Sequence, residues 1–301
     1  MIARAHHEPV GGSASRARRW LLVEQPGAWG RDALRESGLP VEVADHLEVL
    51  RRDLPARVLM LRRTGNALVS RDGEDGGQGR TVFAGISHPG GGGWLERFQI
   101  DRVEDLLDLD LSGLSRGRSV GGEAVADPIY LVCTNGKHDA CCATFGLPVA
   151  KAVTDHCGER AWECSHVGGD RFAGNLVCLP DGIFYGGLDP ETAVAAVAAH
   201  EGGRLLRAYC RGRSTLPFPV QAAELLAREQ LGLDGLDDLR FLGANRSGDV
   251  HRARFAGSDG TVIVATVKRS HDPTPRVMTC GTDPQGPPVH ELIELTQERG
   301  S

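Results

Sequence analysis

The residues best suited to chemistry are four cysteines and a histidine that lie close together in the chain. Cys133, Cys141, Cys142, Cys164 and His166 fall within 34 of the 301 residues, although the chain has only eight cysteines. Thiolates and imidazole together bind either zinc or an iron–sulfur cluster. Without a metal, the same thiols would be redox-active or simply buried in a core.

Rigid elements must hold these side chains for any such chemistry. The apolar run 128–134 predicts a buried strand that ends at Cys133, and Cys141 and Cys142 open the helix that follows. A second strand over 161–165 ends beside the pair Gly168 and Gly169. Strand ends and helix N-termini lie near one another in an α/β fold, and the helix dipole favours a thiolate. The pattern therefore predicts one buried, electron-rich site.

The spacing alone leaves the type of site open. It is neither the paired C-x-x-C of a zinc ribbon nor the C-x₄-C-x₂-C of a plant-type ferredoxin. No C-x-x-C stands at the first strand–helix turn, which disfavours a thiol–disulfide oxidoreductase. The spacing therefore does not decide between an iron–sulfur cluster, a zinc site and unligated cysteines.

Bulk composition narrows the class of protein. The formal net charge of −6 and a pI near 6 argue against a nucleic-acid partner. No run of about 18 apolar residues exists, so we expect no membrane span. The first 20 residues lack an apolar core of a secretory signal, so we expect a cytoplasmic protein, where thiols stay reduced.

Strand-like and helix-like segments alternate, which predicts an α/β fold in several units. Within them we expect a helix over 102–114, a turn-forming loop over 71–80 and a strand over 275–282. The predicted organisation is a disordered lead (1–18), an N-terminal α/β unit (19–125), a central unit of β-loop-α-β-β-α order (126–212) and a small α+β C-terminal region (213–301).

Three stretches resemble one known family. C-x₈-C from Cys133 to Cys142, CSHVGGDRFAGN at 164–175 and RRWLLVEQPGAWGRDAL at 18–34 are similar to the sucrase/ferredoxin-like family, the last to its actinobacterial members. The resemblance covers roughly residues 18–210. It implies a thioredoxin-like ferredoxin domain with a [2Fe–2S] cluster held by two cysteines and two histidines.

Carried over by position, the resemblance makes Cys133, Cys142 and His166 cluster ligands. The second histidine of the family falls on Asp170, which is a departure. Cys164 is the preferred replacement because thiolate is the better iron ligand, with Asp170 close behind and Cys141 a further alternative. We expect Gly168, Gly169 and Arg171 to lie against the cofactor.

The function expected from the resemblance is electron transfer by a redox carrier rather than a catalyst. Its partners would be a flavin-type reductase and an acceptor oxidoreductase. A thiol–disulfide oxidoreductase on the same fold and a structural zinc protein are the alternatives. Lys137 and His138 lie inside the cysteine loop, where they could tune the potential or contact an acidic partner, but we expect them in a solvated loop. We expect the remaining cysteines to pack in the core: Cys157, Cys178, Cys210 and Cys280.

Overall fold

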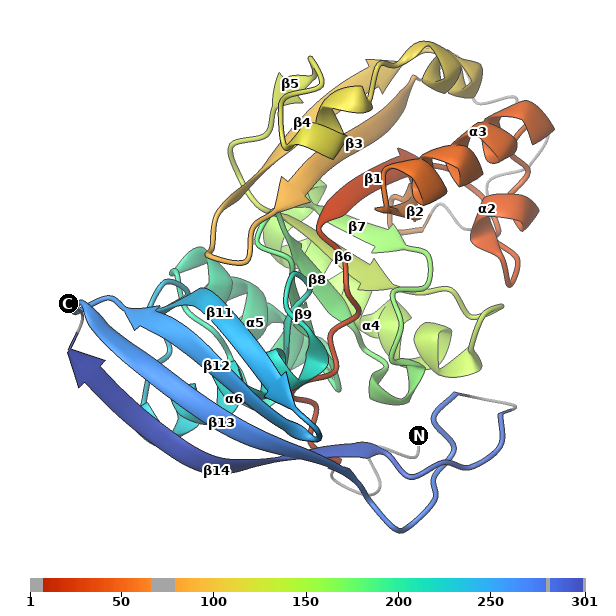
Figure 1. Ribbon diagram of the computed structural model, residues 1–301. Helices are drawn as coiled ribbons and strands as arrows, with labels where there is room; N and C mark the ends of the chain where they lie inside the picture. The colour runs from red at the N-terminus through yellow and green to blue at the C-terminus, as the bar shows by residue number, and fades with distance from the viewer. Residues whose placement is uncertain (1–7, 66–78, 280–281, 300–301) are drawn as a thin grey trace.

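The protein is built on two β-sheets with helices packed against them, as a computed structural model shows (Figure 1). The structure describes residues 8–65, 79–279 and 282–299. One sheet has ten strands in the order β10-β9-β8-β6-β7-β2-β1-β3-β4-β5, and the other has four in the order β11-β12-β13-β14. The fold is mixed α/β, as the alternation of segments predicts.

Two halves of the large sheet share one strand arrangement. In the first half β2 runs parallel to β1, β3 runs antiparallel to β1 on its other side, and β4 follows. In the second half β7, β6, β8 and β9 repeat this pattern. The strand bounds are β1 Arg19–Glu24, β2 Ala56–Arg62, β3 Arg80–Ser87, β4 Gly93–Ile100, β5 Glu123–Ala124, β6 Ile129–Cys133, β7 Ala161–Cys164, β8 Leu176–Leu179, β9 Ile183–Tyr185 and β10 Cys210–Arg213.

The halves join where β2 pairs antiparallel with β7, through Leu61 opposite Cys164 and Arg62 opposite Glu163. The Arg62 guanidinium donates to the Glu163 carboxylate at 2.9 Å, and both side chains are buried. The segments predicted as separate units, 19–125 and 126–212, therefore share one continuous sheet.

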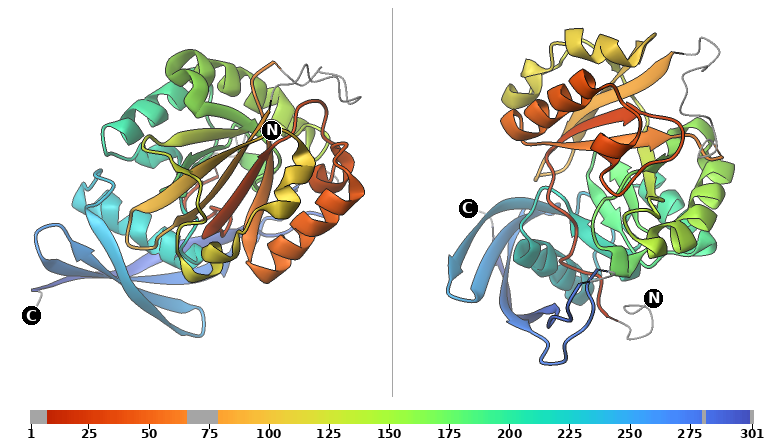
Figure 2. Two further views of the ribbon diagram at one scale, coloured as in Figure 1. Left: turned by 90° about the horizontal axis from the view of Figure 1, so that it is seen from above. Right: turned by 90° about the vertical axis from the view of Figure 1, so that its right-hand side faces the viewer.

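Helices cover the outside of this curled sheet, while its inner faces pack on one another (Figure 2). Phe83 of β3 meets Trp162 of β7 edge-on at 5.7 Å, and Trp20 of β1 lies 6.3 Å from Phe184 of β9. Strand side chains alternate between faces, so neighbouring residues fill the inner core or lie under the helices. The helices are α2 Ala33–Glu36, α3 Val41–Asp53, α4 Ala140–Cys157 and α5 Pro190–Glu201.

One predicted helix, 102–114, is not continuous. Two short 3₁₀ helices, Val103–Asp108 and Ser112–Arg116, replace it, and Leu109 between them is extended. Their buried side chains, among them Leu106 and Leu114, still join the core under the first half. The helical spacing thus marked Val103 and Leu106 correctly as buried, but Leu107 on the same predicted stripe is exposed, and the backbone is not α-helical.

The C-terminal region wraps a four-stranded sheet around helix α6, Phe218–Leu231 (Figure 1). Its strands are β11 Leu239–Ser247, β12 Val250–Gly257, β13 Thr261–His271 and β14 Pro288–Arg299. The strand predicted over 275–282 is absent from the described part, where Arg276 makes a single bridge to Gln285. The strand that completes the sheet is β14 instead, and its Leu292 and Leu295, on either side of a register irregularity, both pack against the core.

The predicted disordered lead over 1–18 differs from what is described of it. Residues 8–18 run in an ordered path between the large sheet and α6, and Ala14 is fully buried. The amides of Ser13 and Ala17 donate to the carbonyls of Arg211 and Ser214. Small residues permit this close approach. Most of the predicted loop 71–80 lies outside the described residues.

Candidate metal centre

Cys133 and Cys142 meet where strand β6 passes into helix α4. Cys133 is the last residue of β6, Cys142 lies in the first turn of α4, and each is about 1% exposed. Asp139 caps the helix by accepting from the amide of Cys141 at 2.8 Å. Gly146 lets α4 lie on β6, since a Cβ there would come within 2.1 Å of the Cys133 carbonyl oxygen. Local helix capping and one glycine thus bring the two thiols together.

His166 reaches the same point from the loop after β7. That strand runs parallel to β6 with Cys164 beside Cys133, so both loops leave the same edge of the sheet. The loop is anchored by the Arg57 guanidinium, which donates to the His166 carbonyl at 2.9 Å. His166 Nδ1 lies 3.8 Å from Cys142 Sγ, and the ligand atoms of Cys133, Cys142 and His166 all lie within 4.8 Å of one another.

Asp170 holds the His166 ring from its other side. His166 Nε2 lies 3.0 Å from Asp170 Oδ1, so an Nε2–H donates to the carboxylate and Nδ1 faces the thiols. Metal-binding histidines commonly have such a carboxylate behind them. The second oxygen, Asp170 Oδ2, is buried and has no hydrogen-bond partner among the described residues. An orphaned buried carboxylate oxygen fits a site that takes a cation.

The charges of the group are coupled. The contact with Cys142, followed by that with His166, lowers the pKa of the Cys133 thiol well below its usual range, while the pKa of Cys142 rises beside it. Burial lowers the pKa of His166, but Asp170 and Cys133 outweigh burial and raise it to about 9. Burial opposes ionisation of Asp170, yet the contact with His166 outweighs burial and keeps the pKa of its carboxyl low. A bound cation would replace the proton on His166.

Comparison with known proteins decides the family. The family model described as Sucrase/ferredoxin-like matches residues 10–212. The chain belongs to the sucrase/ferredoxin-like family. No curated protein and no solved structure matches it. The matched span of this sucrase/ferredoxin-like chain holds the large sheet and every candidate ligand, and it ends before α6.

His138 is a residue that sequence reasoning missed in this sucrase/ferredoxin-like protein. Its ring stacks on His166 with centroids 3.6 Å apart, and His138, His166 and Asp170 form a second group whose ligand atoms lie within 4.8 Å. His138 Nδ1 lies 3.2 Å from the Arg31 carbonyl oxygen, which can only accept. Nδ1 therefore carries the proton and Nε2 keeps a lone pair. Its place in the cysteine loop was the available signal.

Cys164, the preferred fourth ligand, stays apart from both groups. It is fully buried within β7, opposite Leu61 of the neighbouring strand, and burial raises the pKa of its thiol. Cys141 is half-buried and also lies outside the two groups. The cysteines expected to pack, Cys157, Cys178 and Cys210, lie in the core under α4 and α5. Cys280 lies outside the described residues.

The residues expected against the cofactor are spread around the loop. Gly168 and Gly169 both adopt positive φ, at 85° and 77°. Arg171 donates to the Glu8 carboxylate at 2.8 Å and lies over Phe172, so its described contacts are away from the thiols. The structure thus brings the two glycines next to His166 but gives Arg171 a partner elsewhere.

The loop after β1 closes over the cysteine loop. The carbonyl of Gly27 accepts from Arg62 at 2.9 Å, that of Gly30 from Asn135 at 3.2 Å and that of Arg31 from His138. This loop is the EQPGAWGRD stretch at 24–32. It lines, with His138 and His166, a cleft of about 630 Å³ that includes Arg31, Arg51 and Arg57.

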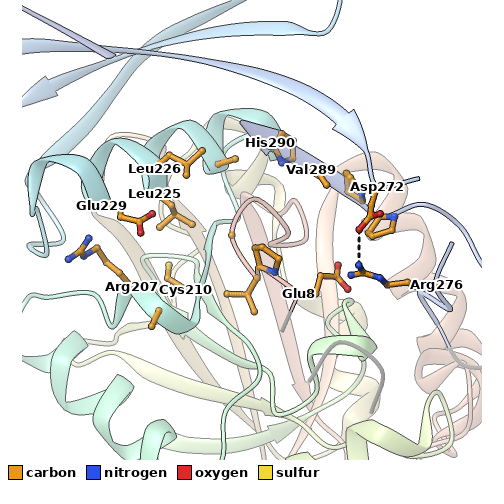
Figure 3. A pocket seen from close by; sticks show the side chains of 17 residues that line it. Glu8, Arg207, Cys210, Leu225, Leu226, Glu229, Asp272, Arg276, Val289 and His290 are labelled. Atoms are coloured by element: carbon orange, nitrogen blue, oxygen red, sulfur yellow. Dashed lines mark hydrogen bonds and ion pairs between the residues drawn. The ribbon is translucent and has the colours of Figure 1, made fainter. Parts of the chain in front are cut away.

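A second cavity, of about 670 Å³, lies elsewhere, between α6, the N-terminal segment and the start of β14 (Figure 3). Leu225, Leu226 and Val289 give it an apolar wall, and His290 Nε2 is buried there with no hydrogen-bond partner in the part of the chain that the structure describes. Asp272 and Arg276 pair with each other across its wall at 2.7 Å, while Glu8 and Arg207 pair with Arg171 and Asp234, which do not line it. None of the candidate ligands lines it.

Among the described helices, none is both long and apolar enough to cross a membrane.

Proposed function

We propose that this protein is an electron carrier that binds a [2Fe–2S] cluster with mixed cysteine and histidine ligation. The convergence of Cys133, Cys142 and His166 within 4.8 Å is the observation that carries the proposal. It is supported by the family match and by a chain arrangement, strands in the order β7-β6-β8-β9, that suits a thioredoxin-like domain. When bound, such a cluster accepts and releases single electrons.

The residues present suit this group. Cys133 and Cys142 supply two buried sulfur ligands, and the low pKa of Cys133 favours its thiolate form. His166 would bind through Nδ1, with Asp170 orienting the ring through Nε2. For the fourth ligand we propose His138 through Nε2, because its tautomer leaves that nitrogen free and its ring already lies on His166.

Access to the site supports the proposed partners. The imidazole pair borders the cleft of about 630 Å³, so it is the side of the centre nearest solvent, while the thiols lie inside. A flavin-type reductase and an acceptor oxidoreductase would approach there. The described cysteines are all free thiols, which suits the reducing cytoplasm that we propose as its location.

Thiol–disulfide exchange on the pair Cys133 and Cys142 is the second candidate, because the two thiols are close and the pKa of Cys133 is low. Exchange needs an attacking sulfur that a substrate disulfide can reach. Each of the two residues is about 1% exposed, which favours metal binding over exchange. A structural zinc site would use the same ligands.

The test is to purify the protein without oxygen from iron-replete cells and to measure iron, acid-labile sulfide, zinc and visible absorbance. We expect two irons and two sulfides per chain and bands that bleach with dithionite. Cys142→Ser should lose them. Cys157→Ser, on the same helix, is the matched control because its hydroxyl can still donate to the Val153 carbonyl. Zinc in place of iron, or a metal-free protein that reduces disulfides, would reject the proposal.

A further inference from the structure

Arg211 is a buried cation directly beneath the loop that carries His166. It is 1% exposed, and its described hydrogen bonds all go to neutral oxygens. Nη1 donates to the Gly168 carbonyl at 2.9 Å and to Asn175 Oδ1 at 2.7 Å. Nε and Nη2 donate to the hydroxyl and the carbonyl of Ser13 at 3.1 and 2.5 Å. One guanidinium thus ties the His166 loop to the N-terminal segment.

The family-like stretch 166–175 is shaped around this guanidinium. Gly169 has φ of 77°, and a Cβ on it would lie 2.2 Å from Arg211 Nη2. On the opposite side, a Cβ on Gly186 would lie 2.7 Å from Arg211 Cδ. Asn175 accepts from Arg211 and donates back to the Gly169 carbonyl at 3.0 Å. The packing around Arg211 therefore explains why a glycine stands at 169 and an asparagine at 175, without direct contact between either residue and a cofactor.

The charge of Arg211 has no carboxylate partner. No ion pair links it to an acidic side chain within the described ranges, although burying an unpaired charge is costly. Burial, followed by the neighbouring Arg171 cation, lowers the pKa of Arg211 to about 9 against the opposing influence of Cys133 and Asp170, so the guanidinium stays charged at neutral pH. The acidic groups that favour its charged form, Cys133 and Asp170, belong to the candidate metal centre.

We propose that Arg211 is a positioning residue that fixes the His166 loop and raises the reduction potential of the centre bound there. The inference rests on the proposed function. One added electron makes the cluster more negative, and a nearby positive charge in a dry environment stabilises that reduced form. The hydrogen bond to Gly168 keeps the charge and the loop at a fixed separation.

The experiment compares Arg211→Met and Arg211→Lys in the full chain, with the surface variant Arg207→Met as control. Arg207 pairs with Asp234 and touches none of the ligands. Anaerobic redox titration followed by EPR gives each midpoint potential. We expect Arg211→Met to shift the midpoint potential to more negative values. Arg211→Lys should have a potential much closer to that of the wild type, and the control should match the wild type. A folded, iron-bearing Arg211→Met with the wild-type potential would overturn the inference.

The lysine variant and hydrogen exchange over 166–170 test the proposal where the methionine variant or the iron is missing. If Arg211→Met does not fold, Arg211→Lys alone tests the role, because lysine keeps the charge but loses the simultaneous contacts to Gly168 and Asn175. A lysine variant with the wild-type potential and unaltered hydrogen exchange over 166–170 would then reject positioning. If wild type lacks iron, the proposed function fails first, and faster exchange of 166–170 in the variants still tests the loop-fixing role.

Discussion

At the scale of single residues, the site is defined by which atoms of its imidazoles are already engaged. The Arg31 carbonyl accepts a hydrogen bond from His138 Nδ1, and the Asp170 carboxylate accepts one from His166 Nε2. Each ring is left with one nitrogen for a metal. Asp170, which the family pattern places as a ligand, thus stands behind His166 in this chain.

This arrangement predicts different losses at the candidate fourth-ligand positions. His138→Ala should abolish or convert the cluster, since it removes a ligand. Asp170→Ala should only weaken binding, by about 10- to 100-fold, as is usual when the partner of a metal-bound histidine is removed. Cys164→Ala should keep full iron. Iron content after dialysis against a chelator, together with EPR line shape, measures all three.

An opposite ranking would change the ligand set. Complete loss in Asp170→Ala with full retention in His138→Ala would make Asp170 the ligand. Loss in Cys164→Ala, in protein whose circular dichroism matches wild type, would restore the thiolate that sequence reasoning preferred.

At the scale of elements, the junction of β2 and β7 determines whether the two halves form one site. Arg62 reaches across it to Glu163, Thr134 and the Gly27 carbonyl, and its guanidinium lies 4.0 Å from the Trp29 ring centroid. The loop after β1 is thereby held against the cysteine loop.

Removing one partner of the buried ion pair between Arg62 and Glu163 should destabilise the folded protein. Arg62→Met leaves the Glu163 carboxylate buried without its cation, and we expect a loss of about 3–5 kcal/mol in the free energy of unfolding. The double variant Arg62→Met with Glu163→Leu should recover much of that loss, because no lone charge remains. Urea unfolding of the three proteins measures both effects; equal stability of the single variant and wild type would contradict the expectation.

A second element-scale contact makes stability depend on pH. His200 of α5 lies 3.0 Å from Asp181 in the turn between β8 and β9. Burial opposes ionisation of Asp181, but this contact outweighs it and lowers the pKa of the carboxyl. The stabilisation is therefore present above the ordinary carboxyl pKa near 4 and is lost as pH falls through it toward the folded-state value.

Asp181→Asn should accordingly cost about 1 kcal/mol at pH 7 and much less at pH 3. Urea midpoints of variant and wild type across this range measure the difference. A gap that stays constant from pH 7 to pH 3 would show that the charge of Asp181 does not contribute.

At the scale of the whole molecule, the N-terminal segment links the C-terminal region to the large sheet. Gln221 of α6 is fully buried and exchanges two hydrogen bonds with the backbone of Ala14, at 3.0 and 2.9 Å. The neighbouring Ser13 binds Arg211, so α6, the segment and the His166 loop form one connected network.

Gln221→Leu should loosen this network. It leaves the buried amide and carbonyl of Ala14 unpaired, at about 1–3 kcal/mol each. We expect faster tryptic cleavage at the exposed Arg16 and Arg18, measured by mass spectrometry. Gln230→Leu, on the exposed side of the same helix, is the control and should match wild type. Cleavage at the wild-type rate in Gln221→Leu would contradict the proposed link.

The sequence by itself determined the features that depend on neighbours in the chain. Helix α4 begins after Asp139 because that side chain caps it, and Cys133 ends a strand because five apolar residues precede the loop. Clustering along the chain grouped Cys133, Cys141, Cys142, Cys164 and His166, and the family resemblance selected Cys133, Cys142 and His166 among them. Helical spacing over 102–114 marked Leu106 as buried but also Leu107, which is exposed, and two 3₁₀ helices stand there in place of the expected α-helix.

Only the tertiary structure decided which side chains complete the group. Contacts between distant segments stack His138 on His166 and bury Cys164 within β7. They also place Arg211 beneath the loop of His166, although it lies 45 residues further along the chain. Spacing along a chain does not specify such contacts, because a side chain's direction and its hydrogen-bond partner are fixed only once strands pair and helices pack.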